Sequence, residues 1–173
     1  MRYALVYGGL AGAVAIGIMI ATFALDLDHL HTLWFGYLVM LVALSMIFVG
    51  VKRYRDVACG GVIRFGRAFG LGLGIAVVAG LIYVLGWELY TALSGWDFMA
   101  DYTAHIVQQM RADGAPPAAI LAKEAEMREM AGMYANPLLR VPMIFAEIFP
   151  VGLLVALVSA ALLRNPKLLP AAR

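Results

Sequence analysis

The stretch "KRYRDVACGGVIRFGRAFGLGLG", residues 52–74, decides how this chain is arranged. It opens with basic side chains around a Gly-Gly pair and ends in a glycine-rich apolar run. The whole chain of 173 residues is 64% hydrophobic and only 14% charged, whereas soluble domains carry about 25% charged residues. A soluble fold of this length could not bury so much apolar surface, so we expect a membrane protein whose main partner is the lipid bilayer.

Four apolar stretches are long enough to cross a bilayer, which takes about 20 residues. They lie at about residues 4–25, 33–51, 68–93 and 142–163. The first follows Arg2 as a signal peptide would, but its apolar run is longer than the ~7–15 residues of such peptides, so we expect it to be a span. The sequence therefore predicts an all-α integral membrane protein in which residues 1–173 form a single four-helix membrane domain.

Charge is distributed unequally between the two sides of these spans. One side carries nine basic residues against one acid, Asp56, and the other carries four bases against eight acids. The nine are Arg2, Lys52, Arg53, Arg55, Arg64, Arg67, Arg164, Lys167 and Arg173. Because positive loops stay in the cytoplasm, the sequence predicts an N-in/C-in protein. The basic loop can also attract anionic lipids, and since topology explains its charge, we expect no nucleic-acid partner.

Residues 95–139, between the third and fourth spans, are too long and too patterned for a plain loop. Pro116-Pro117 divides them into two helices with apolar stripes. The stripes are Phe98, Tyr102, Ile106 and Met110 in the first helix, and Ile120, Met127, Met130 and Tyr134 in the second. We expect an external two-helix hairpin that lies on the membrane, covers a cavity or binds a partner.

The basic loop and its surroundings resemble a known family. The segments "VGVKRYRD" and "GGVIRFGRAFGLG", with "GWELY" and "AEIFPVGLLVALVSAALLRN" further on, are similar to the bacterial membrane proteins of domain of unknown function 4199. The resemblance implies a four-helix protein of the bacterial inner membrane. It implies no activity and no functional residues.

Small residues in the third span form two stripes. Gly66, Gly70 and Gly74 recur every four residues, and Gly72, Ala76 and Gly80 form an adjacent stripe. Such spacing lets two helix backbones approach closely in lipid. Two interpretations stay open: packing within the chain, or a seam for a homodimer or another membrane protein.

Two acidic residues, Glu88 and Glu147, fall inside the predicted spans. Both are expected toward the external leaflet, where two carboxylates at one depth could share a proton or bind a cation. Glu88 follows Gly70 by 18 residues, or five helical turns, and so shares its face. The alternative is that each reaches water or a polar neighbour. The neighbours considered are Tyr83, Trp87, Tyr90 and Arg140.

The helical phase of the last span places Glu147 away from its small residues. Gly152, Ala156 and Ala160 point to the opposite side. Pro150 removes a backbone donor, so it can kink the helix and widen a cavity beside Glu147.

Metal ligation is a weaker hypothesis at two places. His29 and His31 lie in an acidic loop, and Asp101 and His105 share a helix face with Asp97. Carboxylate and imidazole are metal ligands, but a capped loop and a solvated helix face are the favoured explanations of these residues.

Two functions remain as hypotheses. The first is a non-enzymatic accessory or assembly protein that acts by helix association. The second is a small proton- or cation-coupled transporter that uses Glu88 and Glu147. No nucleophile–base pair or cofactor motif is apparent, so an enzyme is not favoured and no cofactor is expected.

Overall fold

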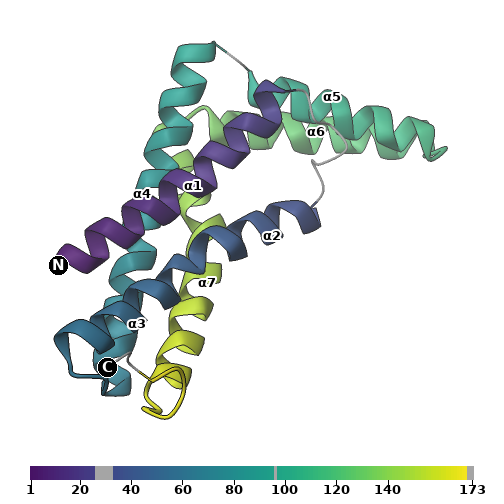
Figure 1. Ribbon diagram of the computed structural model, residues 1–173. Coiled ribbons are helices and arrows are strands. Elements are labelled where there is room, and N and C mark those ends of the chain that lie inside the picture. Colours follow the sequence, from purple (N-terminus) through teal and green to yellow (C-terminus); the bar gives the residue numbers. More distant parts are fainter. Residues whose placement is uncertain (26–32, 96, 171–173) are drawn as a thin grey trace. The chain divides into compact units, whose positions relative to one another are not determined.

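The chain is all-helical in the part that the computed structural model describes, residues 1–25, 33–95 and 97–170 (Figure 1). These residues contain seven helices and no strand. The helices are α1 (Arg2–Ala24), α2 (Leu33–Leu44), α3 (Met46–Ala58), α4 (Phe65–Ser94), α5 (Phe98–Ala112), α6 (Pro117–Tyr134) and α7 (Pro137–Leu163). The all-α prediction is therefore confirmed.

Four helical segments are long and apolar enough to cross a membrane, as predicted. They are Arg2–Phe23, Trp34–Ala58, Phe65–Ser94 and Pro137–Leu163, with 22, 25, 30 and 27 residues. The second consists of α2 and α3, which meet at Ser45. The Ser45 hydroxyl donates to the Val42 carbonyl at 2.6 Å, and its backbone N–H donates to Leu41 at 2.9 Å. Serine back-bonding of this kind is a common local disturbance of a helix.

The fourth span begins earlier than the sequence suggested. Its helix starts at Pro137 rather than near Pro142, because Asn136 accepts a hydrogen bond from the backbone N–H of Leu138 at 3.0 Å. An Asn cap followed by proline at the first helical position is a favourable helix start.

The chain divides into two compact units. The first comprises Met1–Trp87 and Phe145–Arg173, and the second comprises Glu88–Ile144. The first unit holds most of the four apolar spans, and the second holds α5, α6 and the adjoining ends of α4 and α7.

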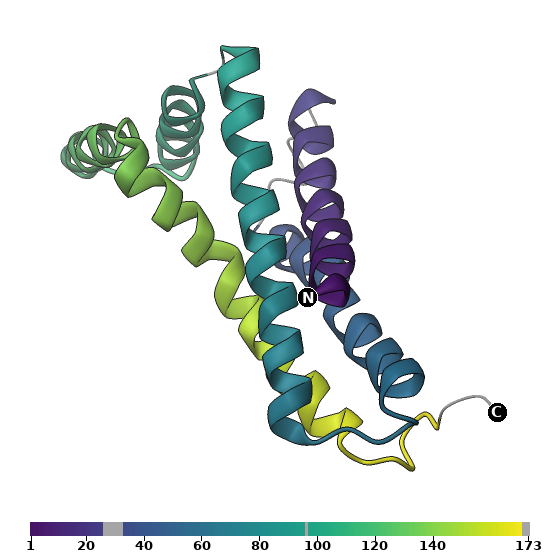
Figure 2. The same cartoon turned by 90° about the vertical axis from the view of Figure 1, so that its left-hand side faces the viewer.

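Within the first unit, α1 runs alongside α4 in the same direction (Figure 2). Residue i of α1 faces residue i+70 of α4 at four successive turns. The facing pairs are Ala4–Gly74, Gly8–Val78, Gly12–Ile82 and Ile16–Gly86. A Cβ added to Gly8 would stand 2.6 Å from that of Val78, and one added to Gly12 would stand 2.6 Å from the Ala79 carbonyl oxygen. Glycine is thus what allows the two backbones to approach.

The helix α7 packs on another side of α4 in the opposite direction. Gly72 faces Ala156, Ala76 faces Gly152, and Gly80 lies under the Phe145 ring. The helices α1, α4 and α7 form the first, third and fourth spans. If each span crosses the bilayer once, the first must run parallel to the third and the fourth must run antiparallel to it, and these are the directions found.

The second unit contains the predicted helical hairpin, α5 packed against α6. Its buried side chains are Met99, Val107 and Met127. The buried residues of α5 are therefore each one position after a member of the predicted stripe, and Tyr102, a member of that stripe, is 44% exposed.

Large apolar side chains cover much of the outer surface of the spans. On α4, Leu81, Leu85 and Leu89 are 51%, 64% and 60% exposed. Soluble monomers seldom expose continuous apolar patches of this kind, and a bilayer is the solvent that suits them.

We expect Gly12→Ala to destabilise the first unit by about 1–3 kcal/mol, because overpacked contacts cost about that much and the new methyl group would meet backbone rather than a movable side chain. Gly9→Ala is the matched control, since nothing lies within 4 Å of a Cβ at Gly9. Equilibrium unfolding in detergent measures both. Equal stability of the two variants would contradict this account of the α1–α4 contact.

Candidate functional site

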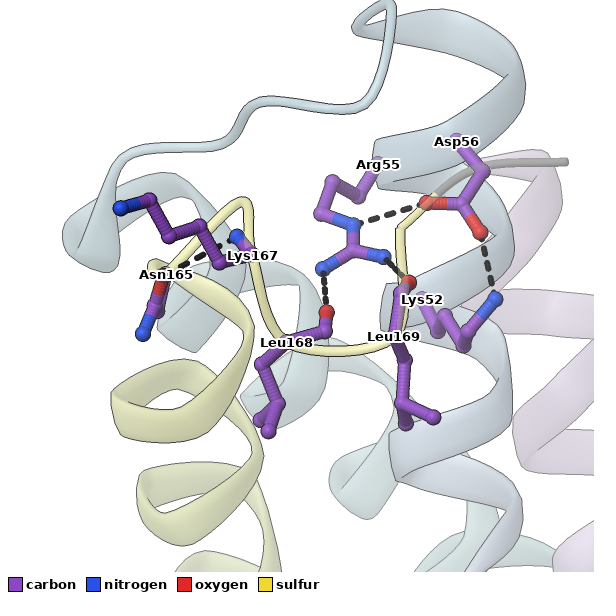
Figure 3. A network of polar contacts seen from close by, with 7 residues as sticks. All are labelled: Lys52, Arg55, Asp56, Asn165, Lys167, Leu168 and Leu169. Atoms are coloured by element: carbon purple, nitrogen blue, oxygen red, sulfur yellow. Dashed lines mark hydrogen bonds and ion pairs between the residues drawn. The ribbon is translucent and has the colours of Figure 1, made fainter. Parts of the chain in front are cut away.

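The basic stretch at residues 52–67 does not present all of its charges to solvent. Arg55 is fully buried, and its guanidinium donates to the backbone carbonyls of Leu168, at 3.0 Å, and Leu169 (Figure 3). The same guanidinium donates to Asp56 through Nε at 2.7 Å. Arg55 therefore fastens the segment after α7 to the end of α3.

Asp56 joins this network to a second cation. Its other carboxylate oxygen accepts from Lys52 Nζ at 2.6 Å, one helical turn away. The sequence pattern only assigned Arg55 to the basic side of the spans and gave no indication of its burial. The available signal was Asp56, the only acid in residues 52–74, which lies next to Arg55 and four residues after Lys52.

The two small-residue stripes of α4 differ in what they contact. Gly72, Ala76 and Gly80 pack against α7 within the first unit. Gly66 and Gly70 have nothing within 4 Å of an added Cβ, and Gly74 has only the Ala4 methyl group, at 3.5 Å. Within the described residues, the end of α4 at Gly66 and Gly70 is therefore an uncovered small-residue face.

Glu88 lies in the second unit and forms an ion pair with Arg140. Arg140 Nε donates to one carboxylate oxygen at 2.7 Å, and Nη2 donates to the other. The guanidinium also lies over the Tyr134 ring, 5.4 Å from its centroid. The Glu88 side chain is 26% exposed and the Arg140 side chain is 21% exposed. The two-pronged geometry is the strong form of a carboxylate–guanidinium contact, and Arg140 was one of the four neighbours considered for the glutamates from the sequence.

Glu147 lies in the first unit, and its surroundings are different. Its neighbours in sequence Ile144 and Ile148 are buried, as are Ala156 and Ala160 further along α7, whereas Glu147 is exposed. Within the described part of the chain it has no hydrogen bond or ion pair. The predicted helical phase is thus the observed one, and the shared proton between Glu88 and Glu147 stays a prediction.

The remaining candidate residues that the structure describes are Pro150, Asp101 and His105, and they do not form a common site. The helix α7 continues through Pro150, whose effect on a cavity stays a prediction. Asp101 and His105 lie on α5, where Asp97 caps the helix by accepting from Ala100 N at 3.1 Å. Among the described residues, no three acidic, His or Cys side chains come together as metal ligands. The other two candidates, His29 and His31, lie outside the described residues.

One known family model covers almost the whole chain. The family model described as "Protein of unknown function (DUF4199)" matches residues 2–165. This chain belongs to the DUF4199 family. No curated protein and no solved structure matches it.

Membership of DUF4199 confirms the resemblance inferred from the basic loop and the glycine-rich third span. The matched region includes Arg55, Glu88, Arg140 and Glu147 and ends before the carbonyl partners of Arg55, at Leu168 and Leu169. The family description supplies no activity, so the function of this DUF4199 protein has to be argued from its own surfaces.

We expect Arg55→Leu to lower the free energy of unfolding of this DUF4199 protein by about 3 kcal/mol, because removing one member of a buried charge network leaves its partners unpaired. The variant should also expose the segment around Lys167 to trypsin, since nothing else described here holds the Leu168 and Leu169 carbonyls. Arg53→Leu is the control, as Arg53 is exposed and lies outside the network. If both variants unfold and are cleaved alike, the fastening role of Arg55 is wrong.

Proposed function

We propose that this protein acts without catalysis, as an accessory or assembly subunit that associates with another membrane-spanning helix. The observation that carries the proposal is the uncovered face of α4 at Gly66 and Gly70. The other glycines of that helix are used by α1 or α7, so intrachain packing explains them. Helices in lipid attract one another mainly by close contact, and a small-residue face that remains free is suited to a second helix.

The charge distribution supports placing both termini and the basic loop on the cytoplasmic side of a bacterial inner membrane. In that orientation α5 and α6 belong to the outer side, where they provide a second surface for association. Tyr102, which is 44% exposed, stacks on the partly buried Phe98 at 5.6 Å, and Phe98 contacts the Tyr134 ring of α6 at 5.8 Å. Exposed aromatic side chains such as Tyr102 are favoured both at protein interfaces and at the membrane surface.

We expect Gly70→Leu to abolish association while leaving the unfolding free energy unchanged, because the new side chain would enter open space in the isolated chain but would separate two paired backbones. Gly36→Leu, on α2, is the matched control, since nothing lies within 4 Å of its Cβ position either. Single-molecule photobleaching in vesicles counts copies of the chain, and purification in mild detergent with mass spectrometry identifies other subunits.

Loss of the same oligomer or subunit in both variants would show a general effect of leucine in the spans. Retention of every oligomer and subunit in Gly70→Leu would remove the basis for association through this face.

A small proton- or cation-coupled transporter is the second candidate, and Glu147 is the observation that favours it. An exposed carboxylate on a spanning helix, without a partner in the described residues, is costly in lipid unless it has a task or lies near the interface. Glu88 contributes less to this hypothesis, because its two oxygens are already occupied by Arg140.

A transporter would lose proton- or cation-driven flux in Glu147→Gln, by at least about tenfold if the carboxylate carries the charge. An accessory protein would show no flux in either form. The measurement is pH-gradient dissipation in vesicles that contain the purified protein, with Glu129→Gln, on the exposed surface of α6, as the control.

A further inference from the structure

The five basic residues of the stretch 52–67 fall into two groups. Arg55 is buried against backbone carbonyls, and Lys52 is paired with Asp56. The other three are exposed and make no ion pair within the described residues; they are Arg53, Arg64 and Arg67. Because Asp56 is the only acid in the stretch and both of its oxygens are occupied, no carboxylate of this stretch is available to neutralise these three.

Two of the three unpaired arginines line one cavity. It has a volume of about 440 Å³ and is formed by Cys59, Val62, Ile63, Arg64 and Arg67. The positive φ angles of Gly60 and Gly61, 62° and 87°, end α3 and turn the chain around this cavity. A volume of several hundred Å³ is that of an ordinary small-ligand site.

The Arg67 side chain is held in place by aromatic rings. Its guanidinium lies 5.5 Å from the centroid of the Tyr54 ring, and Tyr54 contacts Tyr3 edge to face at 5.3 Å. Stacking on an aromatic face orients a guanidinium while its N–H groups remain free to donate. Arg67 is thus arranged to bind an oxyanion without first losing another partner.

Exposed apolar side chains indicate the kind of anion; Val62 lines the cavity, and Val57 and Phe65 lie within two residues of its lining in sequence. Val57, Val62 and Phe65 are 69%, 59% and 39% exposed. They lie where two membrane-spanning helices end, so exposed apolar groups here meet acyl chains while neighbouring arginines reach the phosphate level. A free phosphate would use the arginines alone, whereas a phospholipid uses both the arginines and the apolar rim.

We propose that Arg64 and Arg67, with the cavity walls Val62 and Ile63, bind the phosphate of an anionic phospholipid at this end of the spans. Two guanidinium groups and no carboxylate favour a headgroup of net negative charge over a zwitterionic one. The site is independent of the association proposed above, since it uses other side chains and needs no second protein.

Native mass spectrometry of the full chain in detergent, titrated with phosphatidylglycerol, tests the assignment. We expect Arg64→Gln/Arg67→Gln to weaken binding by at least about tenfold, as charge-assisted hydrogen bonds to phosphate are lost. The charge-matched control is Arg53→Gln/Arg164→Gln, which removes two exposed arginines outside the cavity and should change binding less than about twofold, the level of a diffuse surface charge. Phosphatidylcholine binding should be the same in all forms.

Equal weakening in the two double variants would mean that lipid responds to overall charge, and would overturn the site. Competition by millimolar glycerol 3-phosphate would overturn the lipid assignment in favour of a soluble phosphate ligand. If the glutamine variant does not fold, Arg64→Lys/Arg67→Lys keeps the charge and removes the two-pronged geometry, and unchanged affinity in that variant would contradict the role given to the guanidinium groups.

Discussion

Close contact between helix backbones is the constraint on which the rest of this structure depends. Lipid is as apolar as the side chains that face it, so burying leucine gives little drive for helices to join, and short-range packing has to hold them. Here α1 lies along α4 with Gly8 and Gly12 against the backbone and side chains of Ile75–Ile82. On another side of α4, Gly72 of α4 and Gly152 of α7 allow these two helices to pack closely. Remove these glycines and the helices could still span, but they would not form this unit.

Charged groups follow a second constraint, since each must find a partner or reach water. Arg55 meets it by capping backbone carbonyls beyond α7, and Glu88 meets it through Arg140. Both arrangements join segments that are far apart in sequence. They fix positions near the ends of the spans, whereas the glycine contacts fix positions in the middle of the spans. Glu147 has no partner among the described residues, and this makes it the residue on which the transporter hypothesis rests.

The proposed functions use residues that take part neither in helix packing nor in ion pairs within the described part of the chain. Among the described residues, Gly66 and Gly70 make no close packing contact, and Arg64 and Arg67 make no ion pair. All four lie in residues 64–70, just before and at the start of α4. A protein of this family could therefore bind lipid and a neighbouring helix through the same end of one span, each with different side chains.

Hydrophobicity and charge in the sequence determined the four spans and the helical pair between the last two, and the segments of the basic loop and the third span indicated the family. Each segment has its own hydrophobicity, charge and periodicity, so these properties predict its structure without knowledge of its neighbours in space. Only the tertiary structure decided which small residues are used, because Gly72 and Gly70 look alike until a neighbouring helix is placed. The same holds for Arg55 and Arg67, identical in type and twelve residues apart, of which one is buried under carbonyls and the other remains exposed. Burial depends on contacts between distant segments, and no local pattern records them.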